Sequence, residues 1–374
     1  MKKRVLPFIA AAFLTLAAAA GTLVGEASSE LPEDDGKMKI GVAISSTTNT
    51  LGASCKKILD AAAAAFDIEI FYCDHGNQSE LIAESVEQLC IAGCTGVICA
   101  GGTDEETSAA LTVCEEKGVY FAQFFNSIDS EKSPELYETA KTSACYIGFS
   151  DESEKENGKT LVSMLIANGC RQIGFLMRDR VSDACTLELE GALEAIEEWN
   201  SENPEDRVMS GEPLCPGTLL ASAQSSASDL LNGDPAVDGI LLLGASEDML
   251  TGVRNAVSEA GKTDSVGIVS DALIPGQLAY IGTESVIGGS GENPCTPLYA
   301  FMMVYQAISG DDSEYAGELN QIICPYLYAA DTEAAQNYQS SFVEGLPYTS
   351  EDFEKMAGES AEQLQESASA MRLS

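Results

Sequence analysis

The alternation of short apolar runs with longer amphipathic segments constrains the fold of this chain most. Between residues 39 and 125, four apolar runs are separated by segments with helical periodicity: "KIGVAIS", "IEIFYC", "TGVICAGG" and "VYFAQFF". Runs that are apolar throughout are typical of strands buried on both faces, and the helices between them supply that cover. This part of the sequence therefore predicts a doubly wound α/β unit with a parallel sheet.

The same rhythm restarts after the polar stretch 127–142. The next apolar runs are "ACYIGFS", "RQIGFLM", "VDGILLLG" and "SVGIVSD", with helical patterns such as 155–169 and 247–261 between them. We therefore predict an α/β fold of two Rossmann-like, doubly wound parallel-sheet lobes with a cleft between them. Ligands of open parallel sheets bind beyond the carboxyl ends of the strands, so the loops after the strands are where a site is expected.

The first residues have the three parts of a secretory signal peptide. Lys2, Lys3 and Arg4 precede an apolar stretch that ends in small residues, which predicts a signal peptide over 1–27 and an acidic linker over 28–37. A retained N-terminal anchor is the alternative. We expect an exported protein of the periplasm or the outer face of the cell envelope.

The charge and the cysteines exclude several classes of partner and cofactor. A formal net charge of −39 repels nucleic acid and anionic lipid surfaces. Most of the 12 cysteines sit in apolar runs, where they act as small hydrophobic residues, although one or two disulfides stay open. Cys90, Cys94 and Cys99 lack the two-residue gap with which zinc sites usually start. The glycine-rich "IGGSGENP" (287–294) lacks the strand-to-helix context of a dinucleotide site and is expected to be a flexible crossover. No metal and no cofactor are predicted.

The order of the motifs resembles the type I periplasmic binding proteins, the ribose-binding-like solute receptors of sugar ABC transporters. The resemblance rests on "KIGVAIS", "AGCTGVICAGGTD", "LEGALEAI", "SEDMLTGVRNAVSEAGK" and "VGIVSDA" and covers roughly residues 38–345. It implies two lobes joined by a hinge of three crossovers. The implied division is 38–142 plus 283–311 for the N-terminal lobe, 143–282 plus 312–345 for the C-terminal lobe, and 346–374 for a C-terminal tail.

The same resemblance implies a set of ligand-binding residues in the loops after the strands: Ser45, Asn49, Asp104, Asn126, Glu188, Ser246, Glu247, Asp271 and Glu284. The site departs from the family pattern in its charges and its aromatics. Glu188 replaces an arginine, and Leu51 and Gly52 stand where sugar-binding members place two stacking aromatic rings. Other aromatic residues that could stack on a sugar are Phe124, Phe125, Tyr280 and Tyr299.

These departures bear on the ligand. Carboxylates that face one cleft without a cation are costly to desolvate, unless the ligand donates many hydrogen bonds or carries positive charge. A sugar is the expected ligand, and an amine-bearing or cationic ligand is the alternative.

The resemblance implies a monomeric, non-enzymatic receptor that delivers its ligand to an ABC permease. One alternative is a sensor that hands its ligand to a membrane-bound kinase. Another is a glycoside-acting cleft enzyme with Glu247 and Asp248 as its acid and base, although adjacent side chains at a helix start diverge. His75 is the only histidine and is interpreted as a surface-loop residue rather than a catalytic one. We expect Ser246 or Glu247 to cap the helix 247–261.

Overall fold

The computed structural model describes residues 36–76, 78–283, 285–310 and 319–373, and residues from Lys37 onward form one compact unit. The expected signal peptide (1–27), nearly all of the acidic linker (28–37) and Glu284 lie outside the described residues. Within the described part of the chain, no helix is long and apolar enough to cross a membrane.

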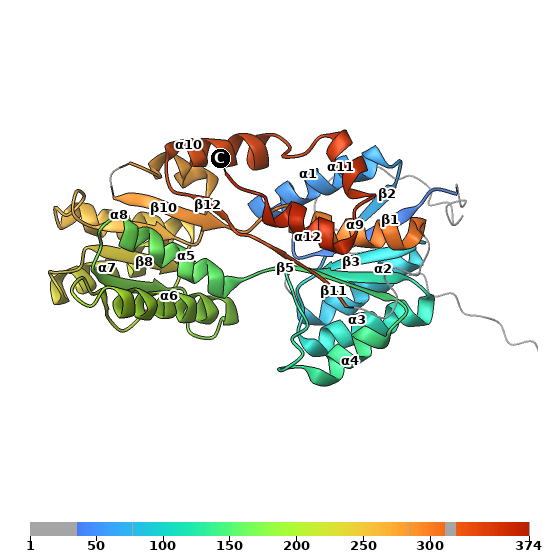
Figure 1. The fold of residues 1–374 in the computed structure, drawn as a ribbon, viewed down its shortest axis with the longest axis horizontal. Coiled ribbons are helices and arrows are strands. Elements are labelled where there is room, and N and C mark those ends of the chain that lie inside the picture. Colours follow the sequence, from blue (N-terminus) through green and yellow to red (C-terminus); the bar gives the residue numbers. More distant parts are fainter. Residues whose placement is uncertain (1–35, 77, 284, 311–318, 374) are drawn as a thin grey trace, which may run out of the picture. The chain divides into compact units, whose positions relative to one another are not determined.

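The first lobe is built on a parallel sheet of six strands in the order β11-β5-β4-β3-β1-β2 (Figure 1). Its strands are β1 (Lys39–Ile44), β2 (Glu69–Asp74), β3 (Gly96–Ala100), β4 (Tyr120–Phe124), β5 (Tyr146–Glu152) and β11 (Asn320–Cys324). Its helices are η1 (Ser79–Leu81), α1 (Thr50–Ala65), α2 (Ile82–Ile91), α3 (Asp104–Lys117), α4 (Pro134–Thr142) and α9 (Thr296–Ser309).

Both faces of this sheet are covered, as the continuous apolar strands predict. Successive strand residues point to opposite faces, so Val42 packs in one cluster with α1 and α9, while Ala43 packs in another with α2, α3 and α4. Helix α9 is buried along most of its length, including Tyr299 and Phe301, which are fully buried.

The second lobe has a six-stranded sheet in the order β12-β10-β9-β8-β6-β7, parallel except for the antiparallel pair β10–β12. Its strands are β6 (Gln172–Met177), β7 (Met209–Ser210), β8 (Gly239–Leu243), β9 (Gly267–Ser270), β10 (Val286–Gly291) and β12 (Leu327–Ala329). Its helices are α5 (Glu154–Ala167), α6 (Asp183–Glu202), α7 (Leu220–Gly233), α8 (Glu247–Glu259), η2 (Pro275–Tyr280), α10 (Thr332–Tyr338) and η3 (Gln339–Glu344). The predicted two-lobed α/β fold is confirmed.

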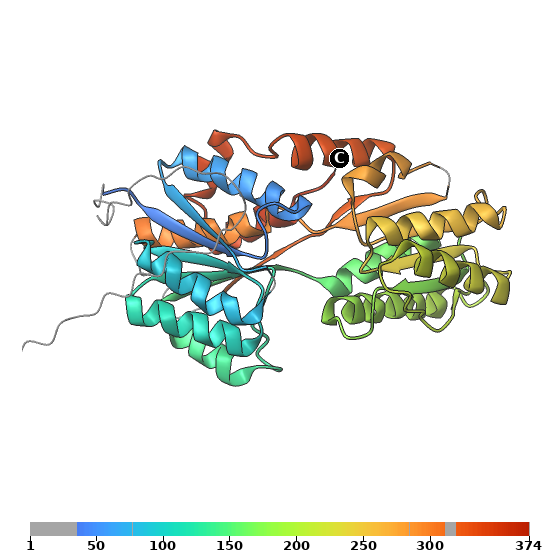
Figure 2. The ribbon, with the colours of Figure 1, turned by 180° about the vertical axis from the view of Figure 1, so that it is seen from behind.

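The chain changes sheets later than the expected boundaries. We predicted crossings at 142/143, 282/283 and 311/312, but β5 and β11 belong to the first sheet and β10 to the second. We took the polar stretch 127–142 for the end of the first lobe. It contains α4, which connects β4 to β5 within the first sheet. The chain passes between the sheets three times, after β5, after β10 and after β11 (Figures 1 and 2).

Most of the glycine-rich segment that we expected to be a flexible crossover (287–294) forms β10, and residues 292–294 begin the crossover that follows this strand. Glycine is required there because a Cβ on Gly289 would lie 2.7 Å from the Ser270 carbonyl oxygen of the neighbouring β9. Close approach of two backbones, rather than flexibility, therefore explains Gly289.

The C-terminal tail is ordered and packs on the first lobe. It holds α11 (Ser350–Met356) and α12 (Ala361–Ser369). Gln365 of α12 accepts a hydrogen bond from the Ile323 N–H (2.7 Å) and donates one to the Ile323 carbonyl (2.9 Å). This side chain thereby satisfies the exposed edge of β11, a position at which an unpaired strand would invite association.

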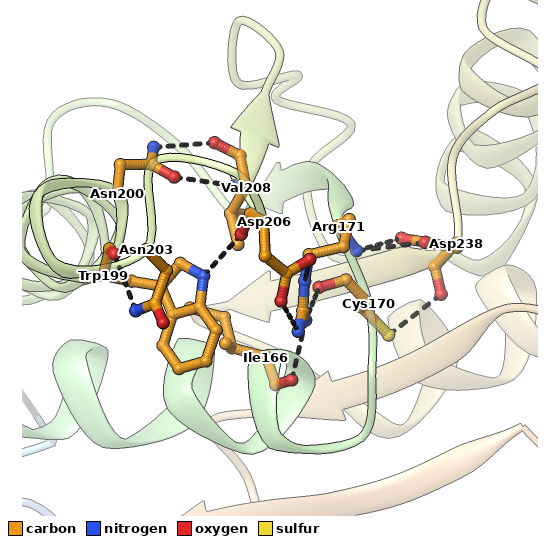
Figure 3. A network of polar contacts seen from close by, with 9 residues as sticks. All are labelled: Ile166, Cys170, Arg171, Trp199, Asn200, Asn203, Asp206, Val208 and Asp238. Atoms are coloured by element: carbon orange, nitrogen blue, oxygen red, sulfur yellow. Dashed lines mark hydrogen bonds and ion pairs between the residues drawn. The ribbon is translucent and has the colours of Figure 1, made fainter.

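A polar network fixes the start of β6 in the second lobe (Figure 3). Arg171 forms a two-point contact with the Asp206 carboxylate (2.8 and 2.7 Å), and its guanidinium lies 5.1 Å from the ring centre of Trp199. The Asp238 carboxylate accepts the backbone N–H groups of Arg171 and Gln172. The network ties the start of β6 to the end of α6 and to the loop before β8.

Candidate functional site

A cleft of about 1220 Å³ opens at the carboxyl ends of the first-sheet strands. The loops after β1, β3 and β4 line it, together with the ends of β5 and β10 and the first turns of α5 and α6. The sequence-based expectation placed a site in these loops. Of the proposed site residues, Ser45, Asn49, Asp104 and Asn126 line this cleft.

The loop after β1 presents Ser45 and Asn49. Asn49 is the N-cap of α1, and its side-chain oxygen accepts the Gly52 N–H at 2.7 Å. Gly52 is required in this turn because a Cβ there would lie 1.7 Å from the Ser46 carbonyl oxygen. A stacking aromatic side chain therefore has no room at position 52.

The loop after β4 supplies the aromatic face and an amide. Phe125 lines the cleft, with its ring edge-to-face against Phe124 at 5.6 Å between centres. The amide of Asn126 donates to the carbonyls of Gly102 (3.1 Å) and Gly101 (3.4 Å), which joins this loop to the loop after β3.

The other aromatic candidates do not line the cleft. Phe124 and Tyr299 are fully buried in the core of the first lobe, where their size fills the space between sheet and helices. Tyr280 lies under the guanidinium of Arg254, 3.4 Å from its ring centre. Among the described residues, Phe125 is the aromatic candidate that lines the cleft.

Asp104 lies at the start of α3, where a carboxylate also complements the helix dipole. Its carboxylate accepts the hydroxyl of Ser133. Thr103 and Glu106 form a capping box on the same turn, in which Glu106 accepts the Thr103 N–H at 2.7 Å. Part of the negative charge at this side of the cleft is therefore already used by the fold.

Three cleft carboxylates at the crossovers escaped the sequence analysis: Asp151, Glu154 and Glu292. Partial removal from water raises the pKa of Asp151 to about 6 and that of Glu292 to about 7, although Glu292 keeps an exposed surface. Glu154 repels both, and Asp271 also repels Glu292. Burial also raises the pKa of Glu154, while Lys132 opposes this shift. Glu292 directly follows β10, so identifying that strand would have revealed it as a residue at a strand's carboxyl end.

The single histidine lies in the cleft wall and not on the surface, which corrects its interpretation. His75 is 3% exposed, and neither ring nitrogen has a hydrogen bond of acceptable geometry among the described residues. Burial lowers its pKa, although the nearby Ala100 carbonyl opposes this shift. The ring is therefore neutral at pH 7, with one donor and one acceptor nitrogen. The signal for it was its place directly after β2, at the same edge of the sheet.

The second-lobe residues that we proposed as ligand contacts do not line this cleft. Glu188 is buried and accepts from the Asn157 amide at 2.7 Å, and Asp271 accepts the N–H groups of Gly244 and Ala245. Burial raises the pKa of both carboxyl groups, and the two groups are hydrogen-bonded to each other. Two carboxyl groups buried side by side share a proton because both cannot ionise there at low cost.

The start of α8 has a structural explanation. Ser246 caps the helix by accepting the Met249 N–H at 3.1 Å, and its hydroxyl donates to the Thr218 carbonyl at 2.8 Å. Glu247 is exposed in the first turn, next to Asp248. The predicted cap is confirmed for Ser246, and both of its hydrogen-bonding roles are used within the protein.

One buried carboxyl group ties the three crossovers together. Glu152 accepts the Asn293 N–H (2.9 Å) and the Thr296 hydroxyl (2.6 Å), and Asn293 donates to the Pro325 carbonyl (3.2 Å). Burial raises the pKa of Glu152 well above its usual value. The hinge is thus built around a carboxyl group that favours its protonated form.

In the part of the chain that the structure describes, no group of His, Cys, Asp and Glu side chains could hold a metal ion. The cysteines are all free thiols, and most of them are buried.

Comparisons with known proteins place the fold. Residues 40–312 match the family model described as a periplasmic binding protein domain. The sequence has no significant match among curated proteins. A solute-binding protein of Actinobacillus succinogenes 130z with bound D-allose is 17% identical, with a TM-score of 0.62 over 81% of this chain and 100% of that one.

Two further solved structures are similar. One from Bacillus halodurans C-125 with bound myo-inositol is 17% identical, with a TM-score of 0.58 over 81% of this chain and 98% of that one. The arabinose transporter component of Shewanella sp. ANA-3 is 14% identical, with a TM-score of 0.58 over 85% of this chain and 95% of that one. At these identities the likeness establishes the fold.

Proposed function

Because the chain belongs to the family of periplasmic binding protein domains, we propose that it is a solute receptor that captures a sugar or polyol and delivers it to an ABC-type permease. The similar structures that carry D-allose, myo-inositol and L-arabinofuranose support a ligand of this class. The proposal includes export to the periplasm or cell-envelope surface, action as a monomer, and no turnover of the ligand.

The observation that carries the proposal is the composition of the cleft. A sugar needs hydrogen-bonding partners for its hydroxyl groups and an apolar surface for the C–H face of its ring. Ser45, Asn49, Asp104 and Asn126 offer the polar groups, and Phe125 offers the ring. The three crossovers beside the cleft suit closure of the lobes around a ligand by hinge motion.

The first test measures the melting temperature of the protein in the presence of each member of a panel of aldoses, polyols and inositols. A ligand at 100 times its Kd adds about 2.7 kcal/mol to the stability of the folded protein, which gives a clear rise in melting temperature. We expect at least one panel member to produce such a rise and to be recovered intact. Recovery of a cleaved glycoside would contradict the receptor function.

A matched pair of variants locates the site. Asn126→Ala removes an amide at the cleft and should weaken binding, whereas Glu247→Ala changes an exposed side chain outside the cleft and should not. Equal affinity of the wild type and both variants would show that the ligand binds elsewhere. A sensor that serves a membrane-bound kinase would bind in the same way, so copurification of the permease from membranes is needed to distinguish the two.

A further inference from the structure

The carboxylates of the cleft differ in how far the fold already uses them. Asp104 accepts from Ser133, Glu106 belongs to the capping box, and Asp129 accepts the N–H groups of Glu131 and Lys132. By contrast, Glu292 has no hydrogen bond within the described residues, although it borders the cleft. Asp151 and Glu154 border the same space.

Glu154 acts on both of the other carboxyl groups, which are half-buried (Asp151) and exposed (Glu292) at the border of the cleft. Glu154 raises the pKa of both Asp151 and Glu292, and Glu292 in turn raises that of the neighbouring Glu152. The cations that act on these groups are Lys132, which acts on Glu154, and Arg178, which acts on Glu292. Removal from water, and after it the charges of Asp271 and Glu154, raise the pKa of Glu292 to about 7, and Arg178 opposes this shift only in part.

His75 is a second, independent sign of a ligand at this cleft. Its ring is 3% exposed and borders the cleft, and neither nitrogen has a hydrogen bond of acceptable geometry within the described residues, although the Ala100 carbonyl lies nearby. Buried polar groups in native proteins are nearly always paired, so such a ring is expected to find its partner on a bound molecule or water. A neutral imidazole can accept one hydrogen bond from a hydroxyl or ammonium group and donate one.

We propose that this cleft selects a sugar or polyol that carries a protonated amine, with Glu292 receiving the ammonium group beside Asp151 and Glu154, and His75 a polar group of the same ligand. The inference rests on the proposed function, since it specifies the ligand class of the same cleft. A neutral sugar would leave the repulsion among the three carboxylates in place. An ammonium group offsets that repulsion and supplies donors to acceptor-only carboxylates. A divalent cation fits less well, because no metal-binding group occurs among the described residues.

The test compares three forms of one ring: glucosamine, glucose and N-acetylglucosamine, with galactosamine and galactose as a second pair. Binding is measured by calorimetry on the whole protein at pH 7 and low salt. We expect the amines to bind at least tenfold more tightly than their neutral and acetylated counterparts. Added salt should reduce this preference, because it screens the ammonium–carboxylate attraction.

Isosteric variants assign the residues. Glu292→Gln and Glu154→Gln should each weaken amine binding about tenfold and leave neutral sugars unaffected, while Glu247→Gln, outside the cleft, should change neither. His75→Phe should weaken binding without lowering the melting temperature of the ligand-free protein. A loss of that melting temperature would instead indicate a structural role for the ring.

The outcomes separate this inference from the function on which it rests. Equal or tighter binding of the neutral sugars, with Glu292→Gln unchanged, would overturn the selection of amines and leave the sugar receptor standing. If no sugar or polyol of either class binds, the receptor proposal itself fails, and the amine inference fails with it.

Discussion

Phe125 has an unusual backbone conformation and a half-buried ring in the cleft wall. It has a φ of +51°, in the left-handed region that side chains other than those of Gly, Asn and Asp rarely adopt. Its N–H donates to the Ser150 carbonyl at 2.9 Å, which holds the loop after β4 against β5. Such strain costs on the order of 1 kcal/mol, and a surrounding structure that fixes it is common at binding sites. The loop thereby orients the ring before any ligand arrives.

Substituting Phe125 should separate binding from folding. Phe125→Asn keeps a residue that tolerates positive φ, so the free energy of unfolding should change by less than about 1 kcal/mol. Loss of the aromatic face should weaken binding of the best panel ligand by about tenfold, consistent with roughly 0.5–1.5 kcal/mol for an aromatic contact. Denaturant unfolding and calorimetry measure the two quantities.

The neighbouring ring provides the control. Phe124 is fully buried, so Phe124→Ala should lower the free energy of unfolding by about 3–5 kcal/mol. If Phe125→Asn destabilises the protein as much as Phe124→Ala does, then Phe125 is a core residue and not a ligand contact.

Helices α5 and α6 of the second lobe pack backbone to backbone. A Cβ on Gly158 would lie 1.8 Å from the Glu188 carbonyl oxygen, and one on Gly191 would lie 1.9 Å from the Lys155 carbonyl oxygen. Both obstacles are backbone atoms, which cannot move aside as a side chain can. The close approach also brings Glu188 to Asn157 and encloses it.

Gly158→Ala should therefore be severe, although alanine is the better helix former. We expect a loss of about 3 kcal/mol or more in the free energy of unfolding, since the two helices must separate. Gly233→Ala is the matched control. That position, at the end of α7, has open space around it, so the change should be neutral or stabilise by up to about 1 kcal/mol. Similar effects of the two substitutions in thermal unfolding would show that the helices do not pack this closely.

The sequence predicted most of the helices and strands, because their burial requires apolar residues at a spacing that the sequence shows directly. The sequence did not predict strand β10, because it is rich in glycine rather than in apolar residues. Gly289 is needed there for the close approach of the β9 backbone, which cannot be read from the local sequence. In the site, the first-lobe residues followed from the family resemblance, which assigns them to the loops after strands. The second-lobe residues Glu188, Ser246 and Asp271 did not line the cleft, because their side chains bond to protein groups that only the folded chain brings together.

The hinge offers a test at the junction of the elements. Glu152→Gln keeps an acceptor for Asn293 and Thr296, and it resembles the protonated carboxyl group that burial favours. It should change the free energy of unfolding by less than about 1 kcal/mol. Glu152→Ala leaves a buried N–H and a hydroxyl unpaired and should cost about 2 kcal/mol or more. If both variants are equally destabilised in denaturant titrations, the negative charge of Glu152 is what holds the crossovers.

At the scale of the whole molecule, charge dominates. The formal net charge of −39 makes mutual repulsion a general cost of folding, and the cleft concentrates carboxylates further. Surface pairs such as Lys155–Glu194 (2.5 Å) offset little of it, because exposed ion pairs contribute at most about 1 kcal/mol. Proton uptake is the most direct way for the folded chain to relieve this repulsion.

The melting temperature should therefore rise as the pH falls from 8 to 5. Asp151, with a pKa of about 6, and Glu292, at about 7, bind protons in the folded state at pH values where an unfolded carboxyl group is ionised. Stability from such groups is complete below the unfolded pKa, about 4, and is lost as the pH rises through the folded values. The buried Glu152 and Glu188 act in the same direction.

Two opposing contributions limit this trend. Burial lowers the pKa of His75, so this residue reduces the stability of the folded protein as the pH falls through the pKa of histidine in the unfolded chain. It is a single group, so the effect is small. Below about pH 4, carboxylates with lowered pKa such as Asp206 and Glu194 lose their partners on protonation, so the maximum should lie near pH 5. Glu292→Gln should flatten the part of the profile between pH 6 and 8. A wild-type melting temperature that rises steadily from pH 5 to 8 would show that the cleft carboxylates are ionised without cost.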